Sequence, residues 1–216
     1  MNTLARLIIA SGVLSLLSLL LLHILSPEFK PSWRMISEYA LGKHKSFLTA
    51  FFLLGSMSTI MLPFLLWNET TSAWAKTGLI LVFVSGIGGL LGGLFDVKHP
   101  LHGLAFALGV PTFPIAALLV SYHLIKKTGW NHYSTGILFS AHATWIGLAF
   151  MAASMILMIS GFKQAGIPIG KDAKPPESVP PGVIAVAGYF NRLLVLCNAG
   201  WAILMASVYL SISETE

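Results

Sequence analysis

Six long apolar runs constrain the fold of this chain more than any other feature of its sequence. They cover about residues 4–25, 47–67, 74–95, 100–125, 135–159 and 183–212. Each run reaches the roughly 20 residues that a helix needs to cross a bilayer. Charged residues make up only 10% of the 216, whereas soluble domains carry about 25%. The sequence therefore predicts an all-α, multi-pass membrane protein with one domain of six transmembrane helices.

The basic residues lie mostly between these runs and indicate an orientation in the membrane. The first, third and fifth connections hold eight of them: Lys30, Arg34, Lys43, Lys45, Lys98, Lys163, Lys171 and Lys174. The other side holds four: Arg6, Lys76, Lys126 and Lys127. The positive-inside rule then predicts a cell-membrane protein whose first, third and fifth connections face the cytoplasm. Such residues meet lipid head groups, so membrane lipids are the expected partners and nucleic acid is not.

The first connection contains a short amphipathic segment. Trp33, Ile36, Tyr39 and Ala40 have the i, i+3, i+4 spacing of one helical face. This spacing predicts a short interfacial helix over residues 33–41.

Glycines in the third run are spaced for close helix packing. Gly88 and Gly92 form one G-x-x-x-G pair, and Gly89 and Gly93 form a second. Small residues at this spacing let another helix approach closely. The partner helix can belong to the same chain or to a second copy, so a homodimer through the Gly88/Gly92 face is one expectation.

Ionisable residues gather on the side of the first, third and fifth connections. That side receives Glu38, His44, Asp96, His99 and His102, and Arg192 enters the membrane from it. Counted from residue 183, Arg192 lies about 14 Å into its helix. An arginine at that depth normally faces the bundle interior and has a partner. We predict that Arg192 pairs with Glu38 or Asp96, either within a functional site or simply as a lock between helices.

The histidines allow two cofactor hypotheses. His99 and His102 are three residues apart and share a helical face, so with His44 they can ligate a divalent metal. Interfacial histidines without a metal explain the same pattern. A b-type haem needs two axial histidines on facing helices, and His102 with His44 or His23 is the candidate pair.

Three short motifs, taken in order, resemble a known family. They are Ile36-Ser37-Glu38-Tyr39-Ala40, then Phe95-Asp96 followed by His102, then Asn191-Arg192. This order resembles the domain-of-unknown-function family 998, a group of six-helix membrane proteins. The resemblance covers nearly the whole chain and implies a six-helix fold. It singles out five residues and implies no reaction: Ser37, Glu38, Asp96, His102 and Arg192.

These residues favour an intramembrane polar site for a lipid-like or anionic amphipathic ligand. Arg192, Ser37, Tyr39 and Asn191 are the candidate ligand-binding residues. If the protein is an enzyme, Glu38 or Asp96 is the candidate general base, and His102 the acid or a metal ligand. No H-E-x-x-H or G-x-S-x-G motif supports catalysis, so the enzyme question stays open. The alternatives are a proton-coupled small-molecule carrier, a metal-dependent lipid hydrolase, a b-type haem protein and a structural or accessory membrane protein.

Overall fold

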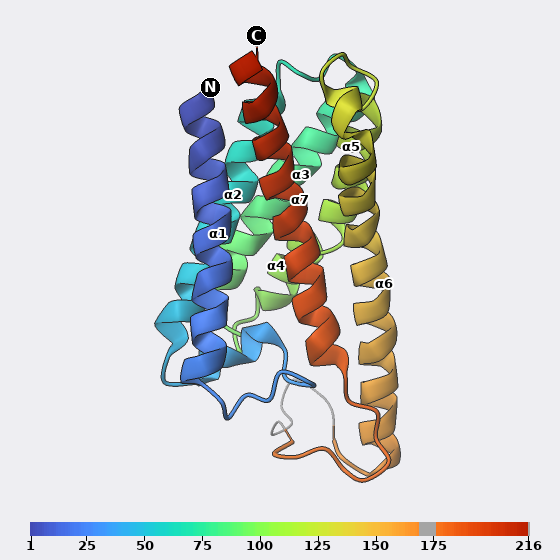
Figure 1. The fold of residues 1–216 in the computed structure, drawn as a ribbon. Helices are drawn as coiled ribbons and strands as arrows, with labels where there is room; N and C mark the ends of the chain where they lie inside the picture. The colour runs from blue at the N-terminus through green and yellow to red at the C-terminus, as the bar shows by residue number, and fades with distance from the viewer. Residues whose placement is uncertain (169–175, 216) are drawn as a thin grey trace.

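The chain folds into a bundle of long helices that run side by side, with both termini at one end (Figure 1). The structure, a computed structural model, describes residues 1–168 and 176–215, so Lys171 and Lys174 lie outside the described residues. Within that part of the chain, six segments are long and apolar enough to cross a membrane. They are α1 (Asn2–Leu25), α2 (Lys45–Leu66), α3 (Ala73–Leu94), α4 with α5 (His102–Gly109 and Thr112–Leu124), α6 (Ser134–Gln164) and α7 (Ala187–Thr215). The predicted all-helical, six-span architecture is confirmed.

The fourth span consists of two helices rather than one. Proline lacks an N–H and its ring clashes with the preceding helical turn, and α4 ends where Val110 and Pro111 interrupt the run. The carbonyl oxygen of Gly109 at this break accepts a hydrogen bond from Ser85 Oγ on α3. The fourth span is therefore fully broken at this point, and Ser85 of α3 supplies a donor to a carbonyl oxygen at the break.

The glycine pairs of α3 are used for packing inside the chain. A Cβ added at Gly88 would collide with the backbone of Gly109, and one added at Gly93 would lie 2.7 Å from Phe52 Cβ on α2. A Cβ at Gly92 would lie 3.3 Å from the Phe52 ring. These contacts show that the glycine pairs pack within the chain, and a homodimer through Gly88 and Gly92 stays a prediction.

Three clusters of buried side chains hold the described part of the bundle together. The largest lies toward the termini and includes Leu62, Leu79, Phe113 and Trp201. The smallest packs Trp33 and Ala187 with Met158 and Phe162 of α6. The third surrounds η1, a 3₁₀ helix at Ile36–Leu41. Its Ile36 and Tyr39 are buried with Leu19, Leu22, Leu48 and Phe51. The helix predicted over residues 33–41 is therefore shorter than expected, and its apolar face is turned into the bundle.

η1 lies at the end of the bundle opposite the two termini, between α1 and α7 (Figure 1). The connection from α6 to α7 is at this same end. A short 3₁₀ helix at Trp130–Tyr133, η2, precedes α6 at the end with the termini. The candidate site described next belongs to the η1 end.

Candidate functional site around Arg192

Arg192 forms four hydrogen bonds at the η1 end, more than any other side chain there among the residues that the structure describes. Its Nε donates to His23 Nε2 on α1 at 2.6 Å, and one terminal nitrogen donates to the carbonyl oxygens of Arg34 at 2.7 Å and Gly188 at 2.9 Å. The other terminal nitrogen donates to the Tyr39 hydroxyl at 3.2 Å. Only 9% of the residue is exposed. Arg192 therefore joins α7 to α1, to the first connection and to η1.

The four partners of Arg192 are all uncharged. Two are backbone carbonyls and one is a phenol. The fourth, His23, accepts from Arg192 at Nε2, so the hydrogen of its neutral ring lies on Nδ1, which donates to Leu19 O at 2.6 Å. A buried charge is normally paired with an opposite charge, but among the residues that the structure describes every hydrogen-bond partner of Arg192 is a neutral dipole.

The prediction that Arg192 pairs with Glu38 or Asp96 is wrong. Glu38 instead forms an ion pair with Arg34 at 3.1 Å, four residues earlier, and accepts from the backbone N–H of Met35 at 2.8 Å. Asp96 accepts from the backbone N–H of Lys98 at 2.9 Å. Both carboxylates are thus bound by donors that are close to them in sequence. Contacts of this kind form within a single connection.

Arg192 also lies less deep than predicted. The helix begins at Ala187 rather than near residue 183, which makes Arg192 its sixth residue, about 7–8 Å from the helix start. At 29 residues, α7 is about 43 Å long, longer than the roughly 30 Å hydrocarbon core. If α7 is centred in the bilayer, Arg192 lies close to the boundary between hydrocarbon and head groups.

A close backbone approach holds the start of α7 against the first connection. The N–H of Gly188 donates to Ser32 O at 2.9 Å. A Cβ at Gly188 would collide with Pro31 O and would lie 2.7 Å from Arg34 O. Asn191, on the next turn, accepts from the N–H of Ile36 at 2.9 Å through its side-chain oxygen. Two residues of the Asn191-Arg192 motif thus fix the position of the segment that carries Tyr39.

Asp96, His99 and His102, which lie between α3 and the start of α4, stay apart from this cluster. His102 Nδ1 lies 3.0 Å from Phe95 O, and the His99 ring stacks on Phe95 and accepts from the N–H of Leu101 at 3.2 Å. Within the described residues, no hydrogen bond or ion pair joins Asp96, His99 or His102 to Glu38 or Arg192. Their contacts shape the connection between α3 and α4. The catalytic roles predicted for Asp96 and His102 stay predictions, as does the metal-ligating role predicted for His99.

The metal and haem hypotheses receive no support from the positions of the histidines. Among the described residues, no group of three or more His, Cys, Asp and Glu side chains is placed to hold a metal ion. His44 is at the N-terminus of α2 and forms no capping hydrogen bond with its side chain. Both ring nitrogens of His23 are occupied by Arg192 and Leu19, so His23 does not fit the role of an axial haem ligand.

Sequence reasoning found part of this site and missed the rest. Arg192, Tyr39 and Asn191 come together as ligand-binding candidates, and Ser37 is half-buried in η1 beside them. The structural roles of His23, Arg34 and Gly188 were not foreseen. The i, i+4 spacing of Arg34 and Glu38 was the one available signal for their ion pair. Hydrogen bonds to backbone carbonyls cannot be predicted from residue types, because every residue has a carbonyl group.

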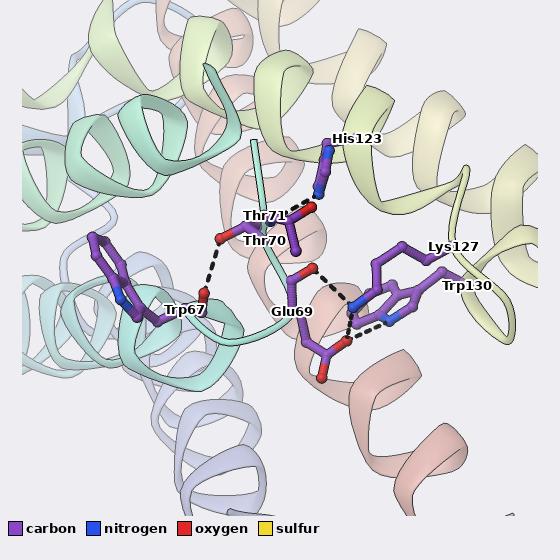
Figure 2. Close-up of polar contacts among 7 residues, drawn as sticks. All are labelled: Trp67, Glu69, Thr70, Thr71, His123, Lys127 and Trp130. Carbon is purple, nitrogen blue, oxygen red and sulfur yellow. Dashed lines mark hydrogen bonds and ion pairs between the residues drawn. The ribbon is translucent and has the colours of Figure 1, made fainter. Parts of the chain in front are cut away.

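A second polar cluster joins two connections at the end with the termini (Figure 2). Lys127 donates to the Glu69 carboxylate at 2.6 Å and to the Glu69 carbonyl at 2.9 Å, and Trp130 Nε1 donates to the same carboxylate at 3.3 Å. The N–H of Thr71 donates to His123 Nε2 at 3.2 Å. These contacts fasten the α2–α3 connection to the end of α5 and the segment that follows it.

Comparison with known proteins identifies a family for this chain. The family model described as "Protein of unknown function (DUF998)" matches residues 9–208, from α1 to α7. No curated protein and no solved structure matches the chain. The family description names no reaction, and the matched range includes all the residues of the Arg192 cluster. The resemblance predicted from the three motifs is confirmed, and the chain belongs to the DUF998 family.

Proposed function

We propose that this membrane protein binds an anionic amphipathic molecule, a phospholipid in the first instance, at the η1 end of the bundle. The observation that carries the proposal is the buried Arg192 guanidinium, whose four hydrogen-bond partners are all neutral. An unbalanced charge in a low-dielectric setting attracts an opposite charge strongly. Four of its five N–H donors are used, which leaves one for a ligand.

The depth and surroundings of Arg192 fit a lipid head group better than a substrate at mid-membrane. Arg192 lies close to the expected hydrocarbon boundary, as derived above. Arg34 is adjacent through its carbonyl oxygen, and 14% of its side chain is exposed beside Glu38. Arg192 offers a phosphate oxygen its positive charge and its one remaining N–H donor. The bundle beside it offers apolar surface for acyl chains.

Stabilisation by added lipid tests this proposal. We expect solubilised phosphatidylglycerol to raise the unfolding temperature of the wild-type protein more than phosphatidylcholine does. Arg192→Gln should remove this difference, because it deletes the charge and the donor fork. The control is Arg6→Gln, an exposed arginine at the other end of the bundle, paired with Glu214. Equal responses to both lipids in the wild type, or an unchanged difference in Arg192→Gln, would overturn the proposal.

One feature favours a carrier as the second candidate. The fourth span is broken between Gly109 and Thr112, and broken helices often border the binding sites of transporters. In a proton-coupled carrier, Glu38 would be the exchanging carboxylate. Transport into proteoliposomes that is driven by a proton gradient, and that Glu38→Gln abolishes, would support this reading over a binding role alone.

A further inference from the structure

A groove on the outer face of the bundle, at the end with the termini, lies between the start of α3 and the end of α5. Its volume is about 380 Å³, at the small end of the range for ligand sites. Seven residues line it: Ser72, Trp74, Leu118, Leu119, Tyr122, His123 and Lys126. The Arg192 cluster is at the opposite end, so this groove plays no part in the function proposed above.

The walls of the groove are held in place by the contacts of Figure 2. The hydrogen bond from Thr71 to His123 joins the segment before α3 to α5. Ser72 caps the N-terminus of α3, and its Oγ accepts from the N–H of Ala75 at 3.1 Å. Glu69 is occupied by Lys127 and Trp130. The groove is thus preformed, and Lys127 is not available to it.

Three groove residues form a row along α5 and its end. Leu118, Tyr122 and Lys126 are each four residues apart, which places them on one face at steps of about 6 Å. From the membrane interior outward, the row presents an apolar group, a hydroxyl and a cation. Lys126 is exposed, and among the described residues it forms no ion pair. The acyl chain, ester and phosphate of a glycerophospholipid follow one another in the same order.

The Tyr122 hydroxyl has a hydrogen to donate. Trp145 Nε1, which can only donate, bonds His142 Nδ1 at 2.9 Å. The hydrogen of the neutral His142 ring is therefore on Nε2, and it is donated to the Tyr122 oxygen at 3.0 Å. Within the described residues, Tyr122 has no other hydrogen-bond partner. A hydroxyl facing lipid with no acceptor is costly, and an ester carbonyl would supply one.

We propose that this groove binds an anionic glycerophospholipid of the leaflet at the end with the termini. Tyr122 donates to an ester carbonyl, Lys126 meets the phosphate, and an acyl chain lies along Leu118, Leu119 and Trp74. Trp74 is 75% exposed and stands at the start of α3, where an aromatic ring suits the membrane interface.

Native mass spectrometry of delipidated protein, after addition of phosphatidylglycerol or phosphatidylcholine, tests the proposal. Tyr122→Phe keeps the ring and removes the donor, so occupancy by both lipids should fall about fivefold. Lys126→Gln should lower phosphatidylglycerol occupancy about fivefold and leave phosphatidylcholine unchanged. The matched controls are Tyr133→Phe and Lys76→Gln, which lie at the same end of the bundle but outside the groove.

The outcomes separate this site from the one at Arg192. Losses in Tyr122→Phe and Lys126→Gln that persist in an Arg192→Gln background support the groove. If lipid occupancy falls in Arg192→Gln but not in Tyr122→Phe or Lys126→Gln, the function proposed above is supported and lipid binding in the groove is overturned. If Tyr122→Phe unfolds, Lys126→Gln decides, because Lys126 is exposed and its loss disturbs no ion pair. Occupancy in Lys126→Gln equal to that of Lys76→Gln would then overturn the proposal.

Discussion

At the scale of single residues, Arg192 connects more parts of the chain than any other polar group at the η1 end. Its hydrogen bonds reach α1, the first connection, η1 and the start of its own helix. The insertion cost of an arginine in a span, about 2.5–3.5 kcal/mol, is offset here by four ordered acceptors. The side chain can therefore hold the bundle together and still present positive charge to the membrane.

Removing this side chain should destabilise the protein markedly. Arg192→Ala leaves the acceptors on His23 and Arg34 without donors, at about 1–3 kcal/mol each, which corresponds to a fall of roughly 4–24 °C in Tm. The measurement is thermal unfolding in mild detergent. Arg6→Ala is the control, since 68% of that side chain is exposed and its ion pair contributes little. Equal Tm values for the two variants would show that Arg192 is not held as described.

The close approach of Gly188 gives a second test on the same helix. In Gly188→Ala the new methyl group would collide with backbone atoms of residues 31–34, which cannot move as a side chain can. We expect a loss of about 1–3 kcal/mol. Gly200→Ala is the matched control, because nothing lies within 4 Å of its added Cβ, and alanine favours the helix by up to about 1 kcal/mol. A Gly188→Ala protein as stable as Gly200→Ala would contradict the docking of α7.

The sequence supports the choice of Arg192 but not its partners. A lone arginine in an apolar run must be accommodated, so its importance follows from its place in the chain. Glu38 was the obvious acid on that side, yet Arg34 is four residues away from it on the same segment and forms the pair. The carbonyl of Arg34 and the ring of His23 could not be identified, because backbone geometry and ring tautomers are set by the folded arrangement.

At the scale of the helices, five of the six predicted spans correspond to single helices with shifts at their ends. Lengths and apolar runs determine such elements, since every backbone group in a bilayer must be paired within the helix. The fourth span differs because Pro111 has no N–H to donate. At this point Ser85 of α3 donates to the carbonyl oxygen of Gly109, and Gly88 packs closely against Gly109. Which helix meets the break depends on tertiary packing, which periodicity does not contain.

Gly88 therefore provides a test of packing between helices. In Gly88→Ala the added methyl group would collide with the backbone at Gly109 and force α3 away from the α4–α5 break. We expect a lower Tm and no change in oligomeric state, measured by light scattering after size exclusion. Gly136→Ala on α6 is the control, because its Cβ would meet nothing within 4 Å. A dimer that dissociates in Gly88→Ala without loss of Tm would restore the intermolecular interpretation.

At the scale of the whole molecule, the bundle separates two polar ends. Both termini and the Glu69–Lys127 pair are at one end, and η1 with Arg192 is at the other (Figures 1 and 2). The predicted orientation puts the Arg192 end in the cytoplasm. The two lipid sites proposed here would then lie in opposite leaflets.

Cysteine labelling in intact cells tests the predicted orientation. Cys197, the single cysteine, is replaced by serine, and Glu214→Cys or Lys98→Cys is introduced at either end. A membrane-impermeant maleimide should label the Glu214→Cys protein from outside and the Lys98→Cys protein only after permeabilisation. The reverse pattern would place the Arg192 end outside the cell and the α3–α5 groove in the inner leaflet.

A solid-state NMR distance measurement can detect the proposed contact between the Arg192 guanidinium and a lipid phosphate group. The chain has three arginines, Arg6, Arg34 and Arg192, so arginine labelled with ¹³C and ¹⁵N gives few signals, which single substitutions assign. In phosphatidylglycerol bilayers, we predict that lipid ³¹P dephases the signal of the Arg192 guanidinium carbon. The control is the Arg6 signal in the Glu214→Gln variant, which shows how much dephasing an exposed arginine gives through ordinary surface contact. An Arg192 signal that phosphorus leaves at full intensity would contradict the account.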